Sequence, residues 1–376
     1  MIQISSKFDS GNIEVLSTED PKAIRLKINR DHNSDFYQWF HFRLTGAEGI
    51  PVGLIIENAA GAAFTGGWKD YRAVASYDRE HWFRIDSQFD GQNLTINLEP
   101  DYGSVWIAYF APYSMERHHD LVAEAQGADG ASLICLGQTL DGRGMDLLHF
   151  EGFGSAPRKK IWCIARQHPG ETMAEWWMEG FLARLSDATD PVVREIRQRA
   201  DVYIVPNMNP DGSFRGHLRT NAAGANLNRE WDTPTMERSP EVVLVRDKMC
   251  QTGVDFCLDV HGDEALPYNF IAGAEGTPDW SDSRAEQLKN FMETLAKVSP
   301  DFQTKVGYPI SKPGTANLSM ATNWIAQEFG CLSMTLEMPF KDTVDTPDLE
   351  QGWSPERCAH LGAAALDAIW SRFEDL

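Results

Sequence analysis

The pattern of the sequence changes at residues 112 to 114, and this change limits the folds that the chain can adopt. Beyond that point, apolar segments such as SLICLG, KIWCIA, DVYIVP, DFCLDVHG and LSMTLEM alternate with longer stretches of helical pattern. Apolar strands separated by helices are typical of a mostly parallel sheet that is covered on both faces. We therefore predict an α/β domain over residues 113–376, with a mostly parallel, mixed central sheet flanked by helices.

Residues 1–112 have a different pattern. Short strand-like segments separated by turn residues follow one another: AIRLKIN, QWFHFRL, VGLIIENA, WFRIDSQF, NLTINLE and VWIAYFA. Such spacing predicts an antiparallel β-sandwich rather than an α/β unit. The length of 376 residues also favours two domains, because a typical domain has ~100–200 residues.

The segment HPGE, residues 168–171, follows an apolar strand and precedes a helical stretch. His168 and Glu171 can bind one zinc ion, because imidazole nitrogen and carboxylate oxygen are both common zinc ligands. Pro169 and Gly170 favour a turn that lets the two side chains converge. The alternative is a loop histidine beside a glutamate that complements the dipole of the following helix.

Two more polar groups come at the ends of apolar strands, where functional groups gather in open α/β sheets. His261, in DVHGD, is the candidate third metal ligand, and the alternative is a hydrogen-bonded core histidine. Asp259 either orients this imidazole or faces the other side of the strand. Glu337, in TLEM, is a candidate general base near a metal, and the alternative is an exposed carboxylate at a strand end.

The segment RGHLRTNAAGANLNREW, residues 215–231, supplies several arginines. One arginine can bind a carboxylate through two hydrogen bonds, and another can stabilise an oxyanion that develops at an attacked carbonyl. The alternative is a solvated loop with surface arginines. The preceding PNMNPDG and the lack of a clear periodicity favour an ordered loop at a site.

Taken together, HPGE, NPDG, Asn228 with Arg229, DVHG and TLEM resemble the zinc carboxypeptidase family in order and context. The resemblance runs from about residue 115 to the C-terminus. The first 110 residues and the PYS segment resemble the cytosolic carboxypeptidase branch, whose members carry a β-sandwich before the catalytic domain. The resemblance implies that Asn228 and Arg229 hold the terminal carboxylate of the substrate, and that Arg219 stabilises the oxyanion.

The resemblance also implies one zinc ion per chain and the residues around it. Its ligands would be His168, Glu171 and His261, and Glu337 would be the base. Tyr308 is the candidate for the mobile tyrosine that family members often have before the base, and the alternative is a packing residue. Thr322 stands where relatives that trim glutamate tails usually have an arginine, which argues against glutamate-tail specificity.

Lys312 or Arg284 could still bring a positive charge to that pocket from another loop. The formal net charge of −21 would repel nucleic acids, anionic membranes and acidic substrates. Neither a signal peptide nor a membrane span is apparent, so we expect a cytoplasmic protein. The six cysteines are scattered along the chain, and we expect them to be buried, reduced thiols.

For two pairs of neighbouring residues we expect structural rather than functional roles. His118 and His119 are adjacent, so they point in different directions, and we expect them at the surface. Trp176 and Trp177 lie in the helical stretch after HPGE and are expected to pack against the sheet.

The sequence thus predicts a zinc metallocarboxypeptidase that hydrolyses the C-terminal peptide bond of peptides or protein tails through a zinc-activated water. A zinc-dependent deacylase of small N-acyl amino acids is an alternative that keeps the metal. A catalytically silent binding module is an alternative of a different class. Neither nucleic acid nor a membrane is expected as a partner, and the sequence does not predict the oligomeric state.

Overall fold

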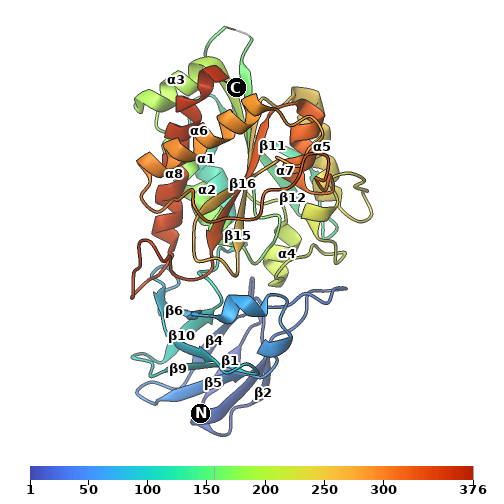
Figure 1. The fold of residues 1–376 in the computed structure, drawn as a ribbon. Helices are drawn as coiled ribbons and strands as arrows, with labels where there is room; N and C mark the ends of the chain where they lie inside the picture. The colour runs from blue at the N-terminus through green and yellow to red at the C-terminus, as the bar shows by residue number, and fades with distance from the viewer. Residues whose placement is uncertain (156, 376) are drawn as a thin grey trace.

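The computed structural model describes residues 1–155 and 157–375 of the chain. Its ribbon has two bodies, a smaller one of strands at the N-terminus and a larger one of helices around a sheet (Figure 1). The last strand of the first body ends at Ala108 and the first helix of the second begins at Met115. The predicted boundary at 112/113 falls in the connection between them. This architecture confirms the predicted fold class.

The N-terminal body is a sandwich of two five-stranded sheets, called the N-terminal sandwich below. One sheet has the order β1 (Gln3–Ser5), β4 (His41–Thr45), β10 (Ser104–Ala108), β6 (Val74–Ser76), β7 (Phe83–Arg84). The other has the order β2 (Glu14–Ser17), β3 (Ile24–Lys27), β5 (Val52–Ile56), β9 (Leu94–Leu98), β8 (Asp86–Phe89). Neighbouring strands are antiparallel, except that β3 and β5 run parallel. In β3 the buried Ile24 and Leu26 alternate with exposed residues, as expected for a strand with one face in a core.

The second body contains a seven-stranded sheet with the order β11 (Ala131–Gln138), β12 (Gly144–Phe150), β14 (Ala200–Val205), β13 (Lys159–Ala165), β15 (Phe256–Asp263), β17 (Leu332–Pro339), β16 (Phe270–Gly273). The four strands from β14 to β17 in this order are parallel, and the outer pairs are antiparallel. Strands β14, β15 and β17 are buried along their whole length, which explains their continuous apolar sequences. The carboxyl ends of β13, β15 and β17 lie at one edge of the sheet.

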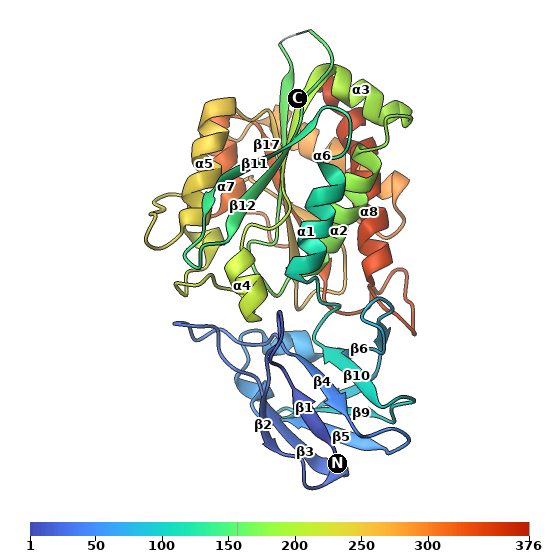
Figure 2. The same ribbon diagram turned by 180° about the vertical axis from the view of Figure 1, so that it is seen from behind.

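Helices cover both faces of this sheet (Figure 2). One side carries α1 (Met115–Ala125), α2 (Met173–Leu185), α3 (Pro191–Arg199), α6 (Asp282–Val298) and α8 (Pro355–Ser371). The other side carries α5 (Pro240–Thr252) and α7 (Ala321–Phe329), while the short α4 (Pro210–Arg215) lies near the N-terminal sandwich. Five 3-10 helices complete the fold: η1 (Pro21–Ala23), η2 (Ala59–Gly61), η3 (Thr65–Trp68), η4 (Leu227–Arg229) and η5 (Phe373–Asp375).

Local sequence signals set where three of the long helices begin. Helices α1, α6 and α8 each follow a serine, at Ser114, Ser281 and Ser354, whose hydroxyl accepts a hydrogen bond from a backbone N–H three residues later. A serine in this place satisfies one of the N–H groups that a helix start leaves without a partner.

Successive side chains of β13 pack on opposite faces of the sheet, into two separate parts of the core. Cys163 packs on the α2 side, whereas Trp162 packs on the α5 and α7 side.

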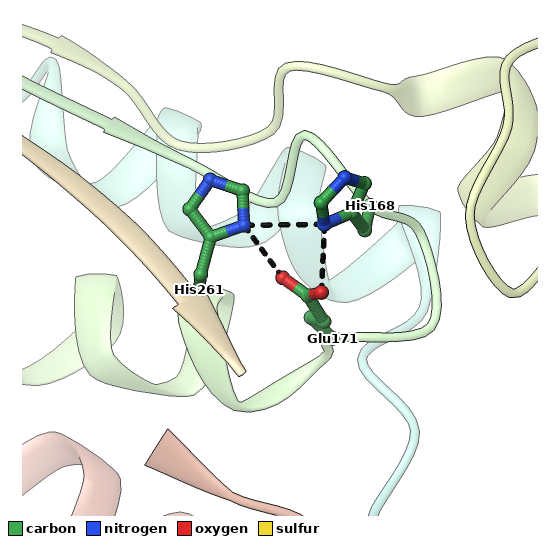
Figure 3. A group of neighbouring side chains, drawn as sticks. All are labelled: His168, Glu171 and His261. Carbon is green, nitrogen blue, oxygen red and sulfur yellow. Dashed lines mark hydrogen bonds and ion pairs between the residues drawn. The ribbon is translucent and has the colours of Figure 1, made fainter. Parts of the chain in front are cut away.

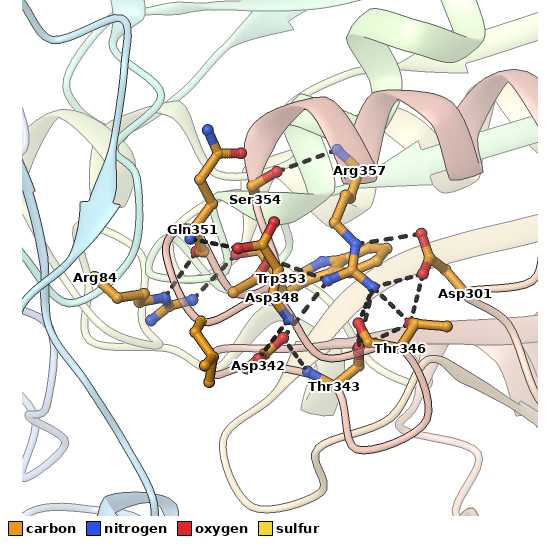
Figure 4. A network of polar contacts seen from close by, with 12 residues as sticks. Arg84, Asp301, Asp342, Thr343, Thr346, Asp348, Gln351, Trp353, Ser354 and Arg357 are labelled. Carbon is orange, nitrogen blue, oxygen red and sulfur yellow. Dashed lines mark hydrogen bonds and ion pairs between the residues drawn. The ribbon is translucent and has the colours of Figure 1, made fainter.

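Contacts between the N-terminal sandwich and the α/β body are extensive. Arg84 of β7 donates hydrogen bonds to the carbonyl oxygens of Phe340 at 2.9 Å, Gln351 at 3.1 Å and Trp353 at 3.1 Å. Figure 4 shows this guanidinium beside the connection that precedes α8. The ring of Tyr109 stacks on Phe340 with 4.7 Å between ring centroids. The two bodies therefore share a continuous interior at this point.

Two structural expectations need correction. His118 is 3% exposed rather than at the surface, because its Nδ1 lies 2.6 Å from Oε1 of Glu175 on α2. His119 is exposed, as expected. Four of the six cysteines are buried, whereas Cys135 and Cys250 are exposed, and all six are free thiols.

The two tryptophans of α2 are buried, as expected. Trp176 contacts the connection before α1, where its indole N–H donates to the carbonyl oxygen of Ala111 at 3.0 Å. Trp177 stacks on Phe181, with 5.0 Å between their ring centroids. Within residues 1–155 and 157–375, no helix has the length and apolarity needed to cross a membrane.

Candidate metal centre and adjoining pocket

The HPGE turn connects the end of β13 to the start of α2, and a buried arginine holds its shape. Arg166 has a φ of 57°, a left-handed conformation that is uncommon for a residue other than glycine. Its Nε donates to the carbonyl oxygen of Pro169 at 3.0 Å, and its Nη1 donates to that of Tyr113 at 2.9 Å. Its charge is paired with Glu175. These contacts fix the turn that carries His168 and Glu171.

Three predicted ligands meet at this turn (Figure 3). Nδ1 of His168 lies 2.7 Å from Oε1 of Glu171, and Nδ1 of His261 lies 2.8 Å from Oε2 of the same carboxylate. The two Nδ1 atoms are 3.2 Å apart. His261 arrives from β15, the strand next to β13, which explains how residues 93 positions apart converge. All three side chains are buried.

The other nitrogen of each imidazole has a partner of its own. Nε2 of His168 lies 3.0 Å from Oδ1 of Asn226. Nε2 of His261 lies 3.0 Å from Oδ2 of Asp259 and 3.3 Å from Nε2 of Gln167. Both rings therefore turn their Nδ1 atoms toward Glu171. Asn226 and Gln167 were not predicted from the sequence, and Asp259 was left undecided.

This trio fits a tetrahedral zinc ion. With zinc–ligand distances of about 2.1 Å, tetrahedral donors lie about 3.4 Å from one another, so the separations of 2.7, 2.8 and 3.2 Å seen here need only a small outward shift of the side chains to hold the ion. Two imidazoles and one carboxylate are a ligand set found in catalytic zinc sites, which leave a fourth position for water or substrate. Partners behind the ligating imidazoles, such as Asp259, fix ring orientation at such sites.

The electrostatics of the trio also suit a cation. Burial and the positive charge of Arg219 lower the pKa of His168 to about 4, which leaves its imidazole neutral. Burial alone would raise the pKa of Glu171, but His168 and His261 outweigh it and hold this pKa below its usual value. The cluster therefore offers a neutral imidazole on His168 and an ionised carboxylate in a site shielded from water. Although burial lowers the pKa of His261, Asp259 and Glu171 outweigh it and raise this pKa, so zinc binding would release a proton from His261.

Glu337 lies beside this trio. It pairs with His261 in the register of β15 and β17, so both side chains leave the same edge of the sheet. Burial raises the pKa of Glu337 well above its usual value, and its Oε2 is buried with no hydrogen-bond partner among residues 1–155 and 157–375. The hydroxyl of Tyr308 donates to Oδ2 of Asp263 at 2.6 Å and also lies 3.3 Å from Oε1 of Glu337. Tyr308 thus contacts Glu337 as well as packing edge-on against Phe270.

A cavity of about 330 Å³ opens beside Glu337. Its lining includes four of the predicted site residues: Asn228, Tyr308, Thr322 and Glu337. The hydroxyl of Thr322 lies 2.7 Å from that of Thr335 on β17, so this wall is neutral and polar. The charged side chains of Glu275 and Lys305 line other parts of the cavity.

Lys312 and Arg284, the two predicted sources of positive charge, do not line the cavity. Arg284 lies near Gly330, before the start of β17 and therefore at the opposite end of that strand from Glu337. Thr322 does line the cavity, so the position where the resemblance predicted an arginine in glutamate-trimming enzymes is neutral here, and Lys305 brings a positive charge from another part of the lining.

The segment from Arg219 to Arg229 lies at the same end of the sheet. The guanidinium of Arg219 lies 5.1 Å from the ring centroid of Phe64, and its charge acts on both His168 and Arg229. Partial desolvation and the charge of Arg219 lower the pKa of Arg229, although much of this side chain remains open to solvent. Oδ1 of Asn228 accepts a hydrogen bond from the N–H of Ala321 at 2.8 Å, which ties η4 to the first residue of α7.

The nine predicted site residues therefore lie at one edge of the central sheet or around the cavity beside it. Comparison with known families matches residues 121–357 to the zinc carboxypeptidase family. The chain belongs to the zinc carboxypeptidase family. Residues 4–110 match the cytosolic carboxypeptidase N-terminal domain, which confirms the resemblance to the cytosolic branch.

Relatives of known sequence and structure support this assignment. A metallo-carboxypeptidase from Pseudomonas aeruginosa, solved in complex with (2-guanidinoethylmercapto)succinic acid, is 45% identical with a TM-score of 0.96, covering 99% of both chains. An uncharacterised protein of Zymomonas mobilis is 52% identical over 375 residues, covering 100% of this chain and 97% of that protein. Human cytosolic carboxypeptidase 1 is 26% identical over 288 residues, covering 64% of this chain but only 23% of that protein. This zinc carboxypeptidase chain thus matches about a quarter of the length of its human relative.

Proposed function

We propose that this protein is a zinc-dependent metallocarboxypeptidase that hydrolyses the C-terminal peptide bond of peptides or protein tails. One observation carries the proposal: the zinc-type trio, a buried carboxylate with an unpaired oxygen and a side-chain-sized cavity adjoin one another. The family match gives the proposal its reaction class. The match of residues 4–110 to a cytosolic carboxypeptidase domain supports a cytoplasmic location.

His168, Glu171 and His261 would hold the zinc ion through two Nδ1 atoms and one carboxylate. When bound, zinc polarises a carbonyl oxygen and lowers the pKa of a water molecule, so that water becomes a nucleophile near neutral pH. Glu337 would accept the proton of the attacking water. It would then deliver that proton to the nitrogen of the leaving amino acid.

The arginines would bind the two anionic parts of the substrate. Arg219 would stabilise the oxyanion that forms at the attacked carbonyl, because its charge already reaches His168 of the trio. Arg229 and Asn228 would hold the terminal carboxylate, and the side chain of the last residue would enter the cavity beside them. Tyr308, whose hydroxyl lies 3.3 Å from Glu337, would contact the substrate at the mouth of this cavity.

Substitution of the base separates catalysis from metal binding. Glu337→Gln keeps the size of the side chain but removes its proton-accepting carboxylate, so kcat should fall by about 10²–10⁴. Zinc content, measured by atomic emission, should stay near one ion per chain. Glu328→Gln, an exposed glutamate on α7, is the matched control and should retain wild-type kcat. Undiminished turnover of Glu337→Gln would remove Glu337 from the base role, and a protein that takes up no zinc would refute the site.

The cavity favours a basic C-terminal residue. The Glu275 carboxylate is half-buried in its lining. Oε2 of Glu275 fits here because position 273 is glycine, where a Cβ atom would lie 2.9 Å from it. The Pseudomonas relative binds a succinic acid with a guanidine group, which combines a carboxylate with an arginine-like cation. The net charge of −21 also attracts cationic substrates.

Peptides that differ only in the last residue test this preference. Peptides ending in Lys or Arg should have the highest kcat/KM, and Glu275→Gln should lower these values about tenfold or more while leaving a peptide that ends in Leu unchanged. Glu286→Gln, an exposed glutamate on α6, is the control. Preferential release of Glu would instead implicate Lys305, and Glu275 would then have no part in recognition.

The two alternatives predict different products in the same assays. A deacylase would hydrolyse N-acyl amino acids faster than peptides, and a silent binding module would hydrolyse neither while still binding zinc. The match of residues 4–110 to the N-terminal domain of cytosolic carboxypeptidases favours the peptidase. The intact trio and Glu337 disfavour the silent module.

A further inference from the structure

The loop that carries Arg219 is held by the N-terminal sandwich as well as by its own body. Nδ2 of Asn12 donates to the carbonyl oxygen of Gly216 at 2.9 Å. A Cβ atom at Gly216 would lie 2.7 Å from the carbonyl oxygen of Ser10, and φ at this glycine is +69°. The backbones of the two bodies therefore touch at the start of the loop, where a side chain would hold them apart.

A single buried carboxylate from the N-terminal sandwich organises the centre of the loop. Asp31 is 3% exposed. Its Oδ1 accepts the N–H of Leu218 at 2.7 Å, and its Oδ2 accepts the N–H groups of Arg219 at 2.8 Å and Thr220 at 2.9 Å. The Thr220 hydroxyl also donates to Oδ2 at 3.1 Å. Four donors from three consecutive residues thus converge on one carboxylate 188 positions earlier than Arg219.

The same region supports the Arg219 side chain. Its guanidinium lies 5.6 Å from the ring centroid of Phe36 and 5.1 Å from that of Phe64. A guanidinium over an aromatic face is attracted to the ring quadrupole, most strongly where water is excluded. Phe64 is fixed in turn, because its N–H donates to Oε1 of Gln38 at 2.8 Å. Both the backbone and the side chain of Arg219 are therefore positioned by residues from the first 64 positions.

We infer that Asp31 is a positioning residue for the peptidase reaction, which sets the place of the Arg219 guanidinium through the backbone of residues 218–220. The N-terminal sandwich is then part of the active site, with Phe36 and Phe64 as the support for the guanidinium. This inference rests on the proposed role of Arg219. Asparagine cannot replace Asp31, because its amide has one acceptor oxygen and would direct an N–H₂ group at backbone donors.

A double-mutant cycle tests the inference. Asp31→Asn should lower kcat about tenfold to a hundredfold at full zinc content, since small displacements of a catalytic group can cost this much. Arg219→Ala should lower kcat by 10²–10³, about the cost of losing one oxyanion donor. The double variant should match Arg219→Ala alone, because Asp31 acts only through that residue. Asp35→Asn, on the same loop but with only an exposed ion pair to Arg30, is the control and should retain wild-type kcat.

A second measurement does not depend on activity. Hydrogen–deuterium exchange of the peptide that covers residues 216–224 should quicken at least tenfold in Asp31→Asn and stay unchanged in Asp35→Asn. If Asp31→Asn does not fold, Phe36→Leu takes its place in the cycle, and its effect on kcat should likewise vanish in the Arg219→Ala background.

Three results would overturn the inference. Losses in kcat that multiply in the double variant would mean that Asp31 acts independently of Arg219. Unchanged exchange at residues 216–224 would mean that Asp31 does not order the loop. Wild-type kcat in Arg219→Ala would refute the role of Arg219 itself. The proposed function can fail separately. If the wild type has no peptidase activity but Asp31→Asn still accelerates exchange, the loop depends on Asp31 and only the proposed function is refuted.

Discussion

Oδ2 of Asp259 lies 3.0 Å from Nε2 of His261, two residues further along β15. Alternate residues of a strand point to the same face, so the carboxylate stands directly behind the imidazole. With Nε2 engaged, the ring presents Nδ1 to Glu171, 2.8 Å away. A residue that was undecided from the sequence therefore determines which nitrogen of a predicted ligand faces the metal centre.

Replacing this carboxylate should weaken zinc binding. Asp259→Asn keeps the shape of the side chain but removes the negative charge, and losses of such partners typically cost about 10–100-fold in metal affinity. Competition with a chromophoric zinc chelator measures the dissociation constant. Asp247→Asn, an exposed aspartate on α5, is the control and should bind zinc as the wild type does. An unchanged dissociation constant for Asp259→Asn would mean that packing alone orients His261.

We predict that the hydroxyl of Tyr308 contributes to catalysis through its contact with Glu337. Tyr308→Phe loses the donor to Asp263 and Glu337, two acceptors for which a hydrogen bond is worth about 1.5 kcal/mol or more. We expect kcat/KM to fall about tenfold at unchanged zinc content, and the free energy of unfolding to fall by about 1.5 kcal/mol. Tyr102→Phe, whose ring is 63% exposed, controls for the loss of a tyrosine hydroxyl. Wild-type kinetics in Tyr308→Phe would leave Tyr308 as a packing partner of Phe270.

Helices α2 and α8 approach each other through two glycines. A Cβ atom at Gly180 would lie 1.9 Å from the carbonyl oxygen of Ala359, and one at Gly362 would lie 2.1 Å from that of Trp177. Either Gly→Ala variant must push the helices apart, so we expect a loss of roughly 3 kcal/mol in the free energy of unfolding, measured with urea. Gly66→Ala, where nothing lies within 4 Å of the added atom, should cost little. A stable Gly362→Ala would show that the contact can relax.

The sequence predicted the sheet and the site residues because both depend on local signals. Long apolar runs indicate buried strands, and polar residues at their ends, such as His261 and Glu337, then meet at one edge of a parallel sheet. The positions of Asn226 and Gln167 behind the ligands were not predicted, since nothing in their neighbourhood marks the direction of an amide side chain. The orientation of Asp259 could have been predicted, because residues two positions apart on a strand point to the same face, here the face of His261.

Contacts between distant segments could not be predicted. No local signal in the sequence marks Asp31, and only the packing of the N-terminal sandwich against residues 218–220 gives its carboxylate four donors. His118 was wrongly placed at the surface for the same reason. Its burial depends on Glu175 of α2, which lies 57 positions away and has no local counterpart in the sequence.

The His118 pair makes stability depend on pH. Burial by itself lowers the pKa of His118, but the charges of Glu175 and Asp146 outweigh burial and raise this pKa to about 9. The folded protein therefore binds the proton more tightly than the unfolded chain, whose histidine has a pKa of about 6.5. The stabilisation is complete below pH 6.5 and is lost as the pH rises through 9. Its size is roughly 3 kcal/mol, since each pKa unit corresponds to about 1.4 kcal/mol.

Urea unfolding of the wild type, His118→Gln and His119→Gln at pH 6 and pH 9.5 measures this contribution. At pH 6, His118→Gln should be less stable than the wild type, because Glu175 and Asp146 then lack their shared cation. The difference between the two proteins should shrink by roughly 3 kcal/mol at pH 9.5, where the wild-type imidazole is also neutral. His119→Gln, an exposed neighbour on the same helix, should follow the wild type at both values. A difference that stays constant between pH 6 and pH 9.5 would mean that His118 is neutral in the folded protein and contributes only packing.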